Sequence, residues 1–205
     1  RPPAGIEIRR AGAEDLGALA ECLQRNHARY QFAPVWTPED LASEERCRGL
    51  RVEDFRLATK NGRVVGCLAA WDQSGFKQTV IHGYEGFLGR ARPGWNAVAR
   101  LLKAPRLPNP GEPLHSIFLS HAAVDDDDPA TLVALVTSAY NDAVGTKHAF
   151  AMVGLAERNP MTPALRRAFR AIEYRSVLYV THWDDGDAAA EALDGRVPHV
   201  EIAIL

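Results

Sequence analysis

One run of the chain, between residues 114 and 155, constrains the fold more than any other part. The apolar run Leu114–Val124, bounded by a proline and an acidic cluster, is typical of an interior strand. His148–Leu155 is a second short apolar run. Two strands joined by a helical crossover should lie parallel in one sheet. Ligands bind such sheets where the strands end and the helix begins, so Ala122–Thr131 is the stretch where a site is expected.

The helix between these two strands has clear boundary signals. Asp128 occupies the N-cap position, Pro129 the first helical position, and Gly145 follows the last turn. One face of this helix is apolar. Its residues are Leu132, Val133, Leu135, Val136, Ala139, Tyr140 and Ala143.

The N-terminal part of the chain predicts a strand, two helices and a hairpin. A short alternating strand around Ile8 precedes a helix over Ala13–Gln24. Thr37, three residues before Asp40, has capping-box spacing and predicts a second helix to about residue 48. Two further strands, Phe55–Lys60 and Arg63–Trp71, flank Asn61-Gly62, a strong hairpin signal.

Composition limits the classes of protein that this chain can represent. It has 205 residues, a formal net charge of −2 and a pI near 6.4, which gives no electrostatic case for nucleic acid or an anionic membrane. No apolar run approaches the roughly 18 residues of a membrane helix, and no secretory signal is visible at the start. The three cysteines have no metal-ligand spacing and fit buried, reduced thiols in a cytoplasmic protein.

The order of elements and several residues resemble the GCN5-related N-acetyltransferase (GNAT) family. The opening IRRAGAEDLGAL is similar to the family's entry signature, the strand ending in Ala123-Val124 to its acyl-CoA segment, and Asn159 to an Asn after its fifth strand. The resemblance implies one α/β (α+β three-layer) domain over residues 1–205, with a mixed sheet of about seven strands and helices on both faces. Tyr174–Trp183 and Val200–Leu205 would form the closing antiparallel pair.

The family's activity is transfer of an acyl group from acyl-CoA to an amine. The resemblance therefore implies acetyl-CoA or another acyl-CoA as co-substrate, no metal, and a small-molecule or peptide amine as acceptor. The pantetheine arm would bond to the main chain of the strand end. The residues implied at the acyl-CoA are Ala122, Ala123, Val124, Ala130, Thr131 and Asn159.

The expected phosphate loop departs from the family pattern. Asp125–Asp128 stands where the family has an Arg or Gln followed by glycines, whose amides approach the pyrophosphate. A carboxylate about 4 Å from a phosphate costs on the order of 1 to 4 kcal/mol, more than the ~0.3 to 1 kcal/mol that a helix terminus returns. Three hypotheses for these carboxylates stay open: capping of the helix in water, a cation site, or recognition of a cationic partner.

The family's leaving-group tyrosine is also missing from the expected fourth helix, which Thr162-Pro163 should begin. His121, near the carboxyl end of the central strand, is the candidate base for the amine proton. Tyr140 is a substitute acid only if it leaves the apolar face of its helix. Both residues could equally be core side chains.

Residues 73–113 form an insert between the third and fourth strands. Between residues 77 and 106 it has six Lys or Arg against one Glu, a net +5, with aromatic residues interleaved. It is either a lid that supplies cations for phosphates or a packed surface excursion. A short helix is expected over Asn96–Leu102.

Two functions therefore remain from the sequence. The leading one is acyl-CoA-dependent N-acyltransferase, in which His121 or water accepts the proton of the amine. The alternative is a catalytically degenerate GNAT-like domain that binds a metabolite or a protein partner. The acceptor, the acyl donor and the oligomeric state, a homodimer included, are left open by the sequence.

Overall fold

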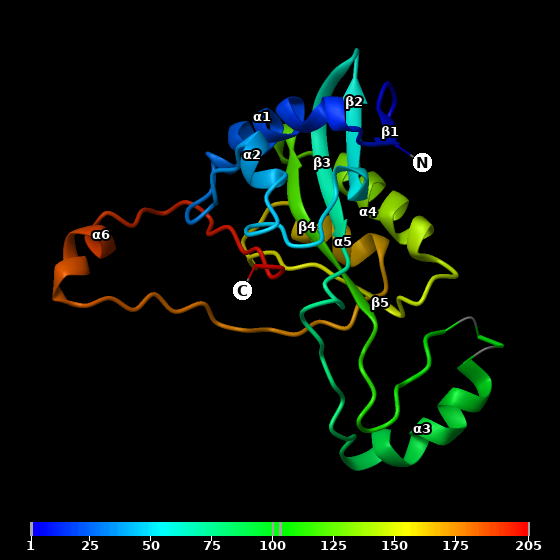
Figure 1. Ribbon diagram of the computed structural model, residues 1–205. Helices are drawn as coiled ribbons and strands as arrows, with labels where there is room; N and C mark the ends of the chain where they lie inside the picture. The colour runs from blue at the N-terminus through cyan, green and yellow to red at the C-terminus, as the bar shows by residue number, and fades with distance from the viewer. Residues whose placement is uncertain (1, 100, 103, 205) are drawn as a thin grey trace.

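The computed structural model describes residues 2–99, 101–102 and 104–204, and a five-stranded sheet lies at its centre (Figure 1). The strand order is β1-β2-β3-β4-β5, with β1 to β4 antiparallel to their neighbours and β5 parallel to β4. The strands are β1 (Glu7–Arg10), β2 (Phe55–Lys60), β3 (Arg63–Trp71), β4 (Ser116–Val124) and β5 (Phe150–Met152).

The hairpin between β2 and β3 forms where the sequence predicts it. Asn61 and Gly62 have φ angles of 51° and 78°. Two consecutive residues with positive φ make the tight turn whose twist matches that of the flanking strands. Both strands have the predicted bounds.

Helices cover both faces of the sheet and make three layers (Figure 1). The helices are α1 (Leu16–His27), α2 (Pro38–Leu41), α3 (Gly86–Ala99), α4 (Pro129–Ala143), α5 (Thr162–Ala168) and α6 (Asp187–Glu191). The apolar side chains divide into two buried clusters, one between α1 and the sheet and the other between α4 and the sheet. Successive residues of β2, Leu57 and Ala58, lie in different clusters, as the two-residue period of a strand requires.

The parallel crossover unit is confirmed. β4 pairs with β5 from Ser116 with Phe150 to Phe118 with Met152, and α4 connects them. Asp128 caps α4 through hydrogen bonds from two backbone amides, and Gly145 has a φ of 80°. The second strand is shorter than the run His148–Leu155 predicts.

The expected closing pair of strands is wrong. The structure has five strands in its described residues, not about seven, and neither 174–183 nor 200–204 is a strand. Tyr174 and Trp183 are largely exposed. Because β5 is three residues long, it offers too short an edge to pair with further strands. Leu205 lies outside the described residues.

Two helices also differ from their predicted lengths. α2 has the Thr37 and Asp40 capping box but ends at Leu41, so a good start signal did not determine where the helix stops. α3 begins ten residues before Asn96 and contains Pro93. Figure 1 shows α3 beyond the end of the sheet where β4 begins, away from the end where β4 leads into α4.

Candidate functional site

The candidate site is the gap that opens where β4 and β5 part. The two strands pair over three residue pairs, and β4 then continues to Val124 while the chain after Met152 leaves it. Such a divergence is where ligands bind in parallel sheets. The gap holds a cavity of about 20 Å³, the space of about one water molecule. Its lining residues are Tyr30, Leu119, Ala122, Val153, Gly154, Leu155, Asn159, Met161, His199, Val200 and Glu201.

The C-terminal segment, residues 197–203, fills most of this gap. The backbone N–H of His121 donates to the Glu201 carboxylate at 2.7 Å, and Ala203 N–H donates to the same carboxylate at 3.3 Å. The Gln73 side chain donates to the carbonyl of Ala203. A β4 amide that faces the gap is therefore occupied by a side chain of the same protein.

Glu201 is buried without a cationic partner among the described residues. Burial raises the pKa of its carboxyl, and the two backbone hydrogen bonds only partly offset that effect. A carboxylate in this setting is costly to keep charged.

His121 lies at an irregularity of β4 and is completely buried. Its φ is 51°, unusual for a residue with a side chain, and the β3–β4 register shifts opposite it. Its ring lies 4.5 Å from that of Trp36, with Phe55 and Trp71 also adjacent, and Nδ1 is 2.9 Å from the Ser120 hydroxyl. Burial lowers the pKa of His121 to about 3, so the imidazole is neutral at pH 7.

Tyr140 and His121 are not brought together. Tyr140 lies eleven residues after the start of α4, about 16 Å along the helix axis, and its side chain is 54% exposed. It therefore leaves the apolar face of its helix, the condition under which the sequence allowed it a role. His121 lies inside the sheet.

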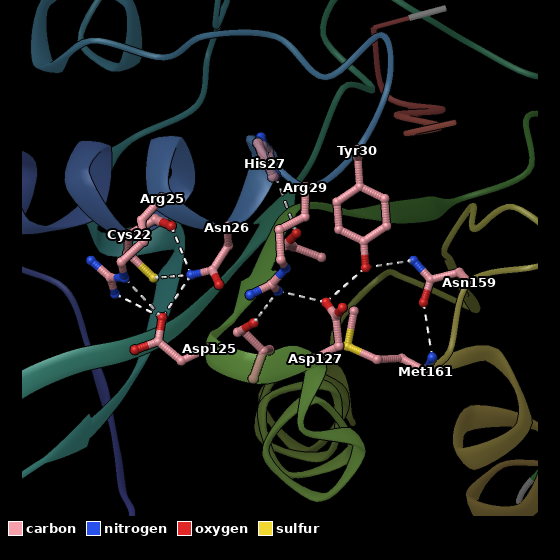
Figure 2. A network of polar contacts seen from close by, with 12 residues as sticks. Cys22, Arg25, Asn26, His27, Arg29, Tyr30, Asp125, Asp127, Asn159 and Met161 are labelled. Carbon is pink, nitrogen blue, oxygen red and sulfur yellow. Dashed lines mark hydrogen bonds and ion pairs between the residues drawn. The ribbon is translucent and has the colours of Figure 1, made fainter. Parts of the chain in front are cut away.

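The acidic loop between β4 and α4 is tied to the end of α1, as Figure 2 shows. Arg25 donates two hydrogen bonds to Asp125, at 3.0 and 2.8 Å, and Asn26 donates a third. Arg29 donates to Asp127 at 2.7 Å and to the carbonyl of Val124 at 3.0 Å. The charges of Asp125 and Asp127 are therefore balanced by arginines at and just after the end of α1, whereas Asp126 is exposed.

The first amides of α4 are also occupied. Ala130 and Thr131 N–H donate to the Asp128 carboxylate, and the Thr131 hydroxyl donates to it as well. In this structure Asp128 therefore takes the position that a phosphate oxygen needs for the standard grip. Of the three hypotheses for the acidic run, helix capping applies to Asp128. Two of the other carboxylates instead form ion pairs with arginines of the same chain.

Asn159 joins the same network through Tyr30. Its Nδ2 donates to the Tyr30 hydroxyl at 3.4 Å, and its Oδ1 accepts from Met161 N–H at 2.9 Å (Figure 2). The Tyr30 hydroxyl donates to Asp127 at 2.7 Å. Burial, together with the Asp127 carboxylate, raises the pKa of this phenol well above its usual range.

Sequence reasoning missed the residues that close the site. Arg25 lies on α1 and Arg29 lies two residues after its end, and their spacing of four is a signal that could have suggested an acidic partner. Tyr30 is the next residue. Glu201 gave no signal, because a single Glu in an apolar stretch reads as a solvent-facing strand residue.

A second, more open cavity of about 390 Å³ also lies against the C-terminal segment. His199, Val200 and Glu201 line both cavities. The other lining residues of the larger cavity are Phe32, Pro34, Leu178, Tyr179, Val180, Thr181 and Ile204.

Three further features concern metal binding, membrane-spanning helices and the state of the cysteines. The described residues contain no group of three or more His, Cys, Asp or Glu side chains placed to hold a metal ion. In the same part of the chain, no helix has the length and apolarity needed to cross a membrane. All three cysteines are buried free thiols, as predicted.

Comparison with known proteins identifies the fold. No protein-family model and no curated protein matches the chain. The ribosomal-protein-alanine N-acetyltransferase of Brucella melitensis biovar Abortus 2308 is similar in structure, with a TM-score of 0.50 and 14% identity, over 87% of this chain and 99% of that one. An aminoglycoside N-acetyltransferase solved in complex with CoA has a TM-score of 0.50 and 11% identity, over 87% and 95%.

The fold is therefore shared with these N-acetyltransferases, which agrees with the resemblance of the sequence to the GCN5-related N-acetyltransferase family. At these identities the likeness establishes the fold, and the reaction has to be argued from the site.

Proposed function

We propose that this protein transfers an acyl group from acyl-CoA to an amine of a small molecule or a peptide. The observation that carries the proposal is the parting of β4 from β5 after three residue pairs, with the His121 N–H directed into the gap. A main-chain donor at that position suits a thioester or a pantetheine amide, because the contact needs no particular side chain. The similar proteins named above are N-acetyltransferases, which supports the same reaction class.

The chemistry that this site would perform is an attack of a neutral amine nitrogen on the thioester carbonyl carbon. The new C–N bond forms, the C–S bond breaks, the amine gives up one proton, and the thiolate of CoA takes up one. Main-chain donors at Ala122, Ala123 and Val124 would hold the pantetheine arm. His121 is the candidate acceptor of the amine proton, but its buried ring and pKa of about 3 make it a weak base at pH 7, so it can act only if the ring becomes exposed. Otherwise the proton passes to water, and exposed Tyr140 is the weaker candidate acid.

The pyrophosphate would need a different grip from that of the family. Ala130 and Thr131 offer their amides only if the Asp128 carboxylate turns away. Asn159 lies beside the gap but is held by Tyr30 and the backbone of Met161. Basic residues of the insert 73–113 can supply the missing charge only if the insert moves as a lid, because its helix α3 lies beyond the opposite end of β4 (Figure 1).

The occupied amides favour a second candidate function. A domain whose loop carboxylates face α1 and whose helix cap is filled could bind a metabolite or a protein partner without thioester chemistry. The two candidates differ in one measurable property, which is binding and turnover of acyl-CoA.

The experiment is a thiol-release assay with acetyl-CoA and a panel of amines. The panel holds an aminoglycoside, a peptide with an N-terminal alanine, and small diamines. We expect release of free CoA with at least one amine, and a decrease of about 10²-fold or more in kcat for His121→Gln if His121 takes the proton. Tyr140→Phe is the matched variant outside the sheet, for which we expect a smaller effect.

No thiol release with any amine, combined with no heat of acetyl-CoA binding at millimolar concentration, would leave the binding-domain function. Release that is unchanged in His121→Gln would keep the transferase and assign the proton transfer to water.

A further inference from the structure

The C-terminal segment, residues 197–203, lines the gap, and one of its residues, Ala203, belongs to the buried cluster between α1 and the sheet. It is not a strand, and its neighbour in sequence, the excursion from residue 170 to residue 196, swings away from the sheet (Figure 1). That excursion exposes large apolar side chains, among them Ile172, Tyr174 and Trp183. The segment is therefore held by its own contacts at the gap.

These contacts are local. Gln31 exchanges backbone hydrogen bonds with Val197 and His199, at 3.0 and 2.7 Å, which makes an isolated parallel bridge to Pro198. Gln73 holds the carbonyl of Ala203 at 2.8 Å. Beyond the bridge, the segment reaches β4 through the Glu201 carboxylate at His121 N–H.

The docked position leaves one carboxylate without a balancing charge and one ring nitrogen without a hydrogen-bond partner. Glu201 is a buried carboxylate without a cation beside it in the described residues. His199 packs its ring 4.4 Å from that of His27, and its Nε2 is buried without a hydrogen-bond partner. Both groups regain water when the segment leaves, so docking and release are closer in free energy than for a segment with only apolar contacts.

The segment also sits against a glycine that allows its close approach. A Cβ added to Gly154 would collide with Cγ2 of Ile202 and lie 3.2 Å from its Cβ. A methyl group at residue 154 therefore requires Ile202 to move, its Cγ2 most and its Cβ by a few tenths of an ångström, which weakens the contact that holds the segment. Gly154 lies two residues after the end of β5 and lines the 20 Å³ cavity.

We propose that residues 197–203 are a displaceable gate, which closes the gap between β4 and β5 with Glu201 and must leave before a thioester can bond to the β4 main chain. His199, Val200 and Glu201 line both the 20 Å³ and the 390 Å³ cavity, so removal of the gate enlarges both. The identity of the ligand that enters rests on the proposed function, but the opening itself does not.

The test uses one variant that releases the gate and one that locks it. Gly154→Ala releases it, and Gly195→Ala is the matched control, because a Cβ there meets no atom within 4 Å. Gln31→Cys with Pro198→Cys locks it, since bridged neighbours lie about 4.7–4.9 Å apart, within reach of a disulfide. Gln31→Cys alone controls for the added thiol beside the three buried native ones.

The first readout is hydrogen exchange of the His121 amide, measured against amides of β2 and β3 that report global unfolding. We expect Gly154→Ala to speed this exchange about tenfold or more, equal to about 1.4 kcal/mol in the opening equilibrium, and Gly195→Ala to leave it unchanged. Oxidation of the cysteine pair should slow it, and reduction should restore it. Equal exchange in the oxidised and reduced pair overturns the gate, even if Gly154→Ala fails to fold.

The second readout is acetyl-CoA binding by calorimetry to the same proteins. Binding to the reduced pair and none to the oxidised pair supports the gate and the proposed function together. Exchange that responds to the lock without acetyl-CoA binding in any form keeps the gate and removes the acyl-CoA function. Equal binding to the oxidised and reduced forms overturns the gate and keeps the function.

Discussion

The carboxylates that border the candidate site differ in whether a cation balances their charge. Asp125 and Asp127 accept hydrogen bonds from Arg25, Arg29 and Tyr30, so their charges are balanced within the protein. Glu201 is buried against a backbone N–H without a cation among the described residues. The first arrangement fixes a loop where the family holds phosphate, and the second leaves a segment that can be displaced. We therefore expect the C-terminal segment, and not the acidic loop, to be the part of the site that moves.

The largest expected effect is an acid loss of stability from the histidines beside Glu201. The folded-state pKa values of His121 and His199 are lowered by burial to about 3 and about 4, below the unfolded value of ~6.5. Below pH 6.5 the unfolded state therefore binds more protons than the folded state, and the free energy of unfolding decreases as the pH is lowered. Two histidines at about 1.4 kcal/mol per pH unit give about 5 kcal/mol between pH 6.5 and 4.5.

Urea unfolding at pH 7, 6 and 5 measures this slope. The lowered pKa of His27 makes this slope steeper. The raised pKa of Glu201 makes it shallower, because protonation of that carboxyl stabilises the folded state as the pH falls. His199→Gln should flatten the slope by roughly the share of one histidine. A stability that is level from pH 7 to 5 in the unmodified protein would contradict the burial of this cluster.

The next effect tests the paired side of the comparison. Arg29→Met removes the donor of the Val124 carbonyl and leaves Asp127 with the Tyr30 hydroxyl but no cation, so we expect a loss of about 1.5 to 3 kcal/mol in the free energy of unfolding. Asp127→Asn is the matched change, and a double-mutant cycle isolates the pair. A coupling near zero would mean that the loop is held by its backbone alone.

A smaller effect concerns the filled helix cap. Asp128→Ala should cost about 1 kcal/mol of stability, as N-cap removal does, and should free the amides of Ala130 and Thr131 for an anion. We therefore expect acetyl-CoA to bind this variant more tightly although the fold is weaker. Asp128→Asn, which keeps the cap, is the control. Weaker binding in Asp128→Ala would show that the cap supports the ligand instead of competing with it.

The smallest effect has the opposite sign and sharpens the contrast with Asp127. Glu201→Gln removes the buried charge and keeps an oxygen that can accept from His121 N–H. We expect the free energy of unfolding at pH 7 to stay level or to rise by at most about 1 kcal/mol. A clear loss of stability, comparable with that of Arg29→Met, would mean that Glu201 has a cationic partner in solution and that the two sides do not differ.

The features that the sequence predicted well depend on neighbouring residues. Asn61-Gly62 determines the hairpin by its own φ angles, and Asp128 with Pro129 determines the start of α4. The parallel pairing of β4 and β5 followed because a tight helical crossover permits little else. These signals operate over a few residues, where backbone sterics and capping decide.

The features that it missed depend on residues far apart. Arg25 and Asp125 are separated by 100 positions, and His121 and Glu201 by 80. A single chain shows charge and spacing but not which distant carboxylate meets which donor. The closing strands failed for a related reason, since no strand edge of sufficient length was there to pair with Val200–Ile204. The apolar alternation there also misled, because Glu201 and Ala203 are the buried residues and Ile204 is exposed.

Binding of acetyl-CoA between β4 and β5 is tested most directly by nuclear magnetic resonance, which maps the ligand onto backbone amide resonances. We expect the largest shifts on the amides of His121 to Val124 and of Val153 to Leu155, on the two walls of the gap. Shifts confined to residues 73–113, or to the excursion between residues 170 and 196, would contradict a site between β4 and β5.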